Sequence, residues 1–144
     1  FQVWSNPNLT QILNPNSSTL FTQYNVFGNN LTGTLDVSNL INIGGIFTAA
    51  ANPNLLALSL PTTLNRYFTV FNVNNCSINL NDINAIFSKL NTYYSSNTPT
   101  TNLYIDTSDG GNASPTGGYS NSDIVSLQSI FSGAGKTLTI NINT

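Results

Sequence analysis

Short segments of alternating apolar and polar residues recur along the chain at near-constant intervals. The tetrapeptide Asn-Pro-Asn-Leu occurs at 6–9 and again at 52–55, which are 46 residues, or two steps of 23, apart. A period between about 20 and 29 residues is typical of arrays in which each unit adds one strand to a stack. The spacing therefore predicts a repeat, with an intermediate unit near residue 29.

Six pairs of apolar residues, each pair separated by one residue, mark the strand expected in each unit. They are Phe1/Val3, Tyr24/Val26, Phe47/Ala49, Phe71/Val73, Leu103/Ile105 and Leu138/Ile140. Successive pairs are 23, 23, 24, 32 and 35 residues apart. Because alternate residues of a strand point to opposite faces, both members of a pair are expected to face one core. The pattern predicts a stack of about six parallel strands.

A column of small side chains, most of them polar, stands three residues after each pair. Its members are Asn6, Asn29, Asn52, Cys76, Ser108 and Asn143. Such side chains are expected to satisfy backbone groups where the chain turns away from the strand. The exception, Cys76, is the only cysteine, and we interpret it as a core residue.

Apolar residues between the strands predict how the chain returns from one strand to the next. Ile12, Leu35/Val37 and Leu58/Leu60 follow the same spacing of 23, which favours an extended return in the first three units. The two long units have room for a helix instead.

In these long units the apolar residues follow helical spacing, which predicts short helices over about 81–94 and 122–132. We expect Asn81 or Asp82 to cap the first helix. Gly133 is expected to end the second helix in the left-handed conformation.

The repeat units carry a resemblance to a known family. Two of them fill the template L-x-x-L-x-L-x-x-N/C-x-L, with the residues Phe21, Tyr24, Val26, Asn29 and Leu31, and Phe68, Phe71, Val73, Cys76 and Ile78. Together with the closing segments 103–106, 122–127 and 133–140, they resemble leucine-rich-repeat proteins of Bacteroidetes-type bacteria and their phages. The resemblance covers essentially the whole chain. It implies an α/β solenoid, here one domain over 1–144, that serves adhesion, host recognition or virion architecture and has no catalytic residues to carry over.

Charged residues are scarce, which narrows the possible partners. Of 144 residues only three are Lys or Arg and five are Asp, whereas 25 are Asn, 18 Thr and 16 Ser. Nucleic-acid binding requires clustered cations and is therefore not expected. No run of 18 or more apolar residues is present, so a membrane-spanning segment is not expected either.

The exposed side of the expected strands is the candidate binding surface. Trp4 and Phe27 should stand side by side there, next to neutral amides, a combination that suits recognition of a sugar or a protein. The candidate residues are Gln2, Trp4, Gln23, Asn25, Phe27, Asn72, Asn74 and Tyr104. In the alternative interpretation, the two aromatic residues cover an interface with an upstream repeat or another chain.

The first strand is expected to be covered by something outside it. Phe1 and Val3 occupy apolar positions, and no polar cap precedes them. Because solenoid units bury their faces against neighbours, we expect these residues to form an assembly end, with the chain as the C-terminal part of a larger chain or assembly.

Candidate residues for catalysis or metal binding are few. Asp106, Asp109 and Asn112 form only a weak calcium candidate, because they lack the ladder of acidic residues of a calcium loop. With no His, no Glu and one Cys, the usual parts of an active site are missing. We expect no enzyme activity, no cofactor and no structural metal.

Two functions remain open at the level of sequence. The first is a non-enzymatic recognition or adhesion module at a phage virion surface or bacterial cell surface, hence extracellular, that binds a host-surface glycan or protein. The second is a structural subunit of a virion or extracellular assembly that self-associates through uncapped solenoid ends, as a homo-oligomer or part of a particle.

Overall fold

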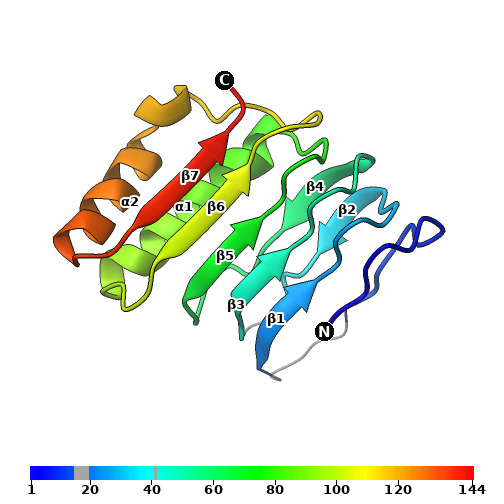
Figure 1. The fold of residues 1–144 in the computed structure, drawn as a ribbon, viewed down its shortest axis with the longest axis horizontal. Coiled ribbons are helices and arrows are strands. Elements are labelled where there is room, and N and C mark those ends of the chain that lie inside the picture. The colour runs from blue at the N-terminus through cyan, green and yellow to red at the C-terminus, as the bar shows by residue number, and fades with distance from the viewer. Residues whose placement is uncertain (15–19, 41) are drawn as a thin grey trace.

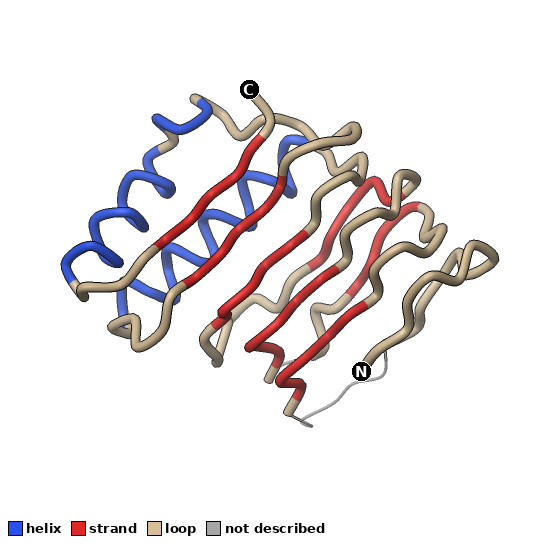
Figure 2. Tube along the Cα trace, viewed as in Figure 1, coloured by secondary structure: helices blue, strands red, loops and turns tan. Residues whose placement is uncertain are grey.

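The alternating segments of the sequence form strands that pair in parallel. A computed structural model describes residues 1–14, 20–40 and 42–144. It is an α/β structure with a five-stranded parallel sheet in the order β1-β3-β5-β6-β7 and a two-stranded parallel sheet, β2-β4 (Figures 1 and 2). The strands are β1 (Phe21–Asn25), β2 (Gly33–Asp36), β3 (Ile43–Thr48), β4 (Leu55–Ser59), β5 (Phe68–Asn72), β6 (Leu103–Thr107) and β7 (Leu138–Ile142).

The chain alternates between two layers. After β1 and β3 it passes through β2 and β4, whereas after β5 and β6 it passes through the helices α1 (Leu80–Ser96) and α2 (Ser122–Gly133). The backbone N–H of Leu58 in β4 donates to the Asp82 carboxylate in α1 at 3.1 Å, so β4 and α1 are neighbours in the same layer. The two predicted helices are present, and so are the extended returns predicted at Leu35 and Leu58, whereas no strand is formed by the described residues around Ile12.

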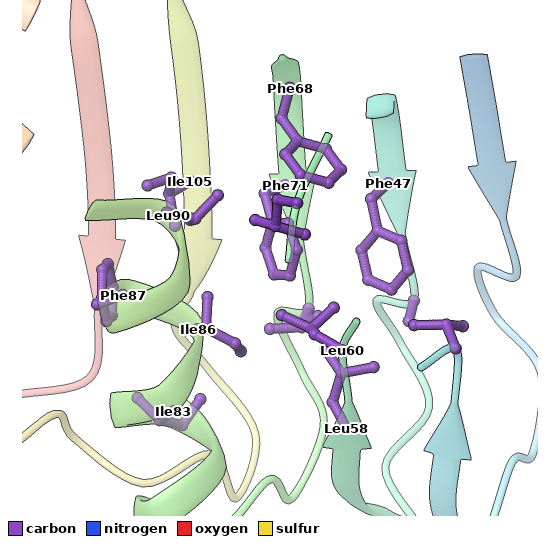
Figure 3. Packing of buried hydrophobic residues seen from close by; sticks show 14 of the residues in the cluster. Phe47, Leu58, Leu60, Phe68, Phe71, Ile83, Ile86, Phe87, Leu90 and Ile105 are labelled. Carbon is purple, nitrogen blue, oxygen red and sulfur yellow. The ribbon is translucent and has the colours of Figure 1, made fainter. Parts of the chain in front are cut away.

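The core lies between these layers. Tyr24, Phe47 and Phe71 project from three adjacent strands and stack, with ring centroids 5.6 and 4.9 Å apart. Figure 3 shows Phe47 and Phe71 in the same cluster as Leu58 and Leu60 from the return side and as Ile83, Ile86, Phe87 and Leu90 of α1. Five of the six apolar pairs of the sequence therefore face one common interior, whereas Phe1/Val3 lies outside this cluster.

The helix ends differ in detail from the prediction. The side chain of Asn79, rather than Asn81 or Asp82, caps α1 by accepting from the Asp82 N–H at 3.1 Å. Asp82 instead accepts a hydrogen bond from the Asn79 side chain. The cap of α2 is Asn121, and α2 ends at Gly133, but the left-handed residue is Gly135.

The first predicted strand is much shorter than expected. Around Phe1 and Val3 the backbone forms a single parallel bridge, between Gln2 and Asn25, so the main sheet has five strands where about six were predicted. Hydrogen bonds nevertheless continue along this edge. The Val3 N–H donates to the Asn25 carbonyl, and the Asn25 N–H donates to that of Phe1.

The predicted register between β5 and β6 is wrong by two residues. Phe71 pairs with Ile105 and Asn72 with Asp106, whereas the spacing of apolar pairs had placed Leu103 and Tyr104 in these positions. A shift of two residues keeps every side chain on its predicted face, since the strand period is two, but it changes the neighbours. Pairing of β6 with β7 follows the prediction, with Ile105 beside Ile140.

The column of asparagines is shifted in the same unit. Asn112, not Ser108, occupies the position after β6, and its side chain donates to the Val73 and Thr107 carbonyls at 2.8 and 3.2 Å. The extra residues before Asn112 form a turn in which Asp109 and Gly110 have positive φ. The pattern of apolar residues gave no signal for this longer turn.

Candidate functional site

The exposed face of the five-stranded sheet gathers most of the residues proposed for binding. Register pairing places Gln2, Asn25, Thr48, Asn72, Asp106 and Asn141 in one row across the strands. A second row, one pleat along, contains Gln23, Ile46, Val70, Tyr104 and Thr139. The face is therefore a polar row beside a row with an apolar centre.

One end of this face presents two aromatic side chains. Trp4 and Phe27 are 53% and 45% exposed. The Ser5 N–H donates to the Phe27 carbonyl at 3.0 Å and Gln2 bridges to Asn25, so Trp4 lies opposite Phe27 in the turn that follows β1. The Asn25 side-chain oxygen accepts from the Phe27 N–H at 3.0 Å, which fixes the amide beside the ring. We name Gln2, Trp4, Asn25 and Phe27 the aromatic patch.

The other end of the face is a network around one carboxylate. The Tyr104 hydroxyl donates to Asp106 at 2.6 Å and accepts from the Asn141 side chain at 3.0 Å. The Ser108 hydroxyl and backbone N–H donate to the other Asp106 oxygen at 2.6 and 3.0 Å. Asn74 approaches the same carboxylate at 3.5 Å.

Electrostatics hold this network in one protonation state near neutral pH. Burial raises the pKa of Asp106, but hydrogen bonds from Ser108, Tyr104 and Asn141 outweigh it and leave the pKa below its usual value. The hydrogen bond to Asp106 and burial both raise the pKa of Tyr104. The group therefore consists of a carboxylate and a neutral phenol, suited to hydrogen bonding rather than to proton transfer near pH 7.

The predicted binding residues thus divide into two groups. The aromatic patch lies near the first strands, while Asn72, Asn74 and Tyr104 lie at β5 and β6; Thr48 and the buried Ala50 come between them. Gln23 is half-buried in the row with Ile46. Ser108 was not predicted as part of the strand face, because the two-residue register shift assigned it to the asparagine column.

The three residues of the weak calcium candidate have different roles. Asn112 is buried, and its side-chain oxygen accepts from the Ile78 N–H at 2.9 Å, so it serves the backbone. Asp106 is engaged by Ser108 and Tyr104, while Asp109 is exposed. Within 1–14, 20–40 and 42–144, no three His, Cys, Asp or Glu side chains gather as metal ligands would.

The proposed assembly end is the open side of the aromatic stack. The ring of Phe1 stacks on Tyr24 with centroids 5.1 Å apart, yet Phe1 remains 47% exposed. Val3 is half-buried. The amino terminus donates to the Gln23 carbonyl at 2.9 Å, which ties this segment to β1.

Comparison with known proteins adds no relative. No protein-family model, curated protein sequence or solved structure matches this chain. In the described part of the chain, neither helix combines the length and apolar character needed to cross a bilayer. Cys76 is buried, and burial raises its pKa to about 11, so it is a thiol at neutral pH.

Proposed function

We propose that this chain is a leucine-rich-repeat-like α/β solenoid that acts as a non-enzymatic recognition module at an extracellular surface, binding a glycan or protein through its exposed strand face. The observation that carries the proposal is the aromatic patch. Trp4 and Phe27 follow the Gln2–Asn25 bridge at the same interval on adjacent segments, each about half exposed, with neutral amides at their sides. Exposed aromatic rings next to hydrogen-bonding groups favour recognition surfaces.

The solenoid interpretation is supported by how each unit repeats the last. Tyr24, Phe47 and Phe71 pair in one row, and Asn29, Asn52 and Cys76 follow each at the same interval of five residues. The returns also stack, with Leu35 beside Leu58. Nearest-neighbour stacking of this kind is characteristic of solenoids, whose long faces serve as binding surfaces.

The setting at a phage virion or bacterial cell surface rests on the resemblance of the repeat units. The chemistry of the strand face agrees with a neutral ligand. Asp106 is the charged residue of the polar row, and its carboxylate oxygens already accept hydrogen bonds from Ser108 and Tyr104. A ligand on this face would be held by stacking and neutral hydrogen bonds rather than by charge.

Substitution of Trp4 tests this proposal. The Trp4→Ala variant is expected to lose at least about 2 kcal/mol of binding free energy, or roughly 30-fold in affinity, as for aromatic hot spots. The readout is a glycan array together with binding to bacterial cells.

The Leu56→Ala variant is the matched control. It removes a side chain that is 54% exposed but lies on β4, in the other layer. It should bind like the parent protein. Failure of the folded parent protein to bind any glycan or cell, or equal binding by Trp4→Ala, would contradict a recognition role for the strand face.

A further inference from the structure

A hollow outside the strand face is built from hydroxyl groups. It has a volume of about 230 Å³ and lies between the return segment after β4 and the C-terminal half of α1. The hydroxyl groups of Thr62, Thr63, Ser88, Thr92 and Ser96 line it, together with the Lys89 side chain and an apolar wall. This volume is below the range of roughly 300–1,000 Å³ typical for drug-sized ligands, so it suits a single small ring.

Lys89 and Thr92 in this hollow each make one internal hydrogen bond and keep further hydrogen-bonding capacity. Lys89 donates to the Pro61 carbonyl at 2.7 Å, which leaves two ammonium protons for another acceptor. Thr92 donates to the Ser88 carbonyl at 2.8 Å, which leaves its oxygen lone pairs available.

Further hydroxyls of the lining face solvent. Thr62, Thr63, Ser88 and Ser96 are exposed, so their hydroxyls are accessible to a ligand. The hollow therefore offers several donors and acceptors, already close together, to a ligand that carries several hydroxyls.

Positive charge is concentrated beside these hydroxyls. Lys89 lines the hollow, and Arg66 follows the lining segment 62–64 by two residues in the sequence. These are two of the three cationic side chains of the chain. Asp82 lies seven residues before Lys89, or about 10 Å along the helix, and its carboxylate accepts from the Leu58 N–H and the Asn79 side chain.

We propose that this hollow binds one acidic sugar residue, a hydroxyl-rich ring that carries a single carboxylate. The carboxylate would face Lys89, the ring hydroxyls would pair with the Thr and Ser hydroxyls, and Tyr93 and Leu64 would supply the apolar wall. This site is separate from the strand face, so it does not rest on the function proposed above.

Titration of the whole chain with simple sugars tests the site. Sodium glucuronate is added to ¹⁵N-labelled protein, and amide shifts are followed by NMR, with glucose and sodium acetate as separate probes. We expect saturable shifts at residues 62–64 and 88–97 with glucuronate, and binding at least 10-fold weaker for glucose and for acetate. Equal binding of acetate would reveal a plain anion site and overturn the proposal.

Charge variants complete the test. Lys89→Gln should weaken glucuronate binding at least 10-fold, whereas Lys136→Gln, the same change in the turn before β7, and Trp4→Ala should leave it within 2-fold. Because Lys89 also holds the Pro61 carbonyl, the exposed Arg66 provides a second variant, and Arg66→Gln should weaken binding about 3-fold. No saturable binding of glucuronate, or parent-like binding by both Lys89→Gln and Arg66→Gln, would overturn the proposal.

Discussion

At the scale of single residues, the asparagine column links successive repeat units through buried hydrogen bonds to the backbone. Asn52 is buried, and its amide donates to the carbonyls of Val26, Ala49 and Ala50 at 2.9, 2.8 and 3.2 Å, while its oxygen accepts from the Leu31 N–H at 3.1 Å. Each such residue joins two successive units. Cys76 substitutes for an asparagine because its thiol still reaches the Ala49 carbonyl, at 3.3 Å.

Replacing Asn52 with alanine should therefore be costly. The change leaves the buried Leu31 N–H without its partner, whereas the Val26 carbonyl still accepts from the Asn29 side chain at 2.8 Å. An unsatisfied buried group costs about 1–3 kcal/mol, so we expect the free energy of unfolding, measured with urea, to fall by that amount. The control Asn54→Ala, which removes an exposed amide bonded to Asn30, should change it by less than about 0.5 kcal/mol. A loss below 1 kcal/mol for Asn52→Ala would contradict this role.

At the scale of elements, apolar spacing was sufficient to predict the returns β2 and β4 and both helices, because each depends on local periodicity. It could not predict the bulges. The pairing of β1 with β3 and of β3 with β5 shifts register near Gly45, where φ is +65°. A glycine in a strand carries no apolar signal, so its backbone conformation is invisible to a pattern of side chains.

Gly45 tests whether this bulge is required. A Cβ at Gly45 would lie 2.2 Å from the Thr22 carbonyl oxygen, in addition to the strain of positive φ. We expect Gly45→Ala to lower the thermal midpoint and to cost about 2–5 kcal/mol, the sum of overpacking and backbone strain.

The control Gly33→Ala separates these two contributions. Gly33 has nearly the same φ, +66°, but nothing lies within 4 Å of its added Cβ, so only the conformational cost of about 1–2 kcal/mol remains. Equal destabilisation by the two substitutions would show that the close approach of Thr22 is unimportant.

At the scale of the whole molecule, the sequence was sufficient to predict the parallel arrangement in two layers. It was not sufficient to predict which residues lie next to one another on the strand face. A register shift of two residues between β5 and β6 does not change which face each side chain occupies. The apolar pattern therefore predicted the correct face for Asp106 but the wrong neighbour on β5. The hollow beside Lys89 was not predicted, because it forms where segment 62–64 meets a helix. Residues distant in sequence supply its two sides, and neither side has a recognisable motif.

Because the chain has few titrating groups, we expect its stability to depend little on pH near neutrality. Without His or Glu, unfolding free energy should vary by less than about 0.5 kcal/mol between pH 5 and 8. The pKa of Asp106 is lowered in the folded state, so its contribution is present above the unfolded value of about 3.9 and is lost as pH falls through the folded value. Stability should therefore decline below about pH 4.

Stability should also decline at alkaline pH, because burial raises the pKa values of Cys76 and Tyr24 in the folded state. Burial raises the pKa of Cys76 to about 11 and that of Tyr24 to about 12, so the folded state favours their neutral forms. This stabilisation is complete below the unfolded values, about 8.5 and 10, and is lost as pH rises toward the folded ones. Urea titrations should show a decline of at most about 1.4 kcal/mol per pH unit starting near 8.5, where Cys76 alone contributes. In Cys76→Ala the decline should begin near pH 10 instead, and identical profiles of the two proteins would rule out Cys76 as the source.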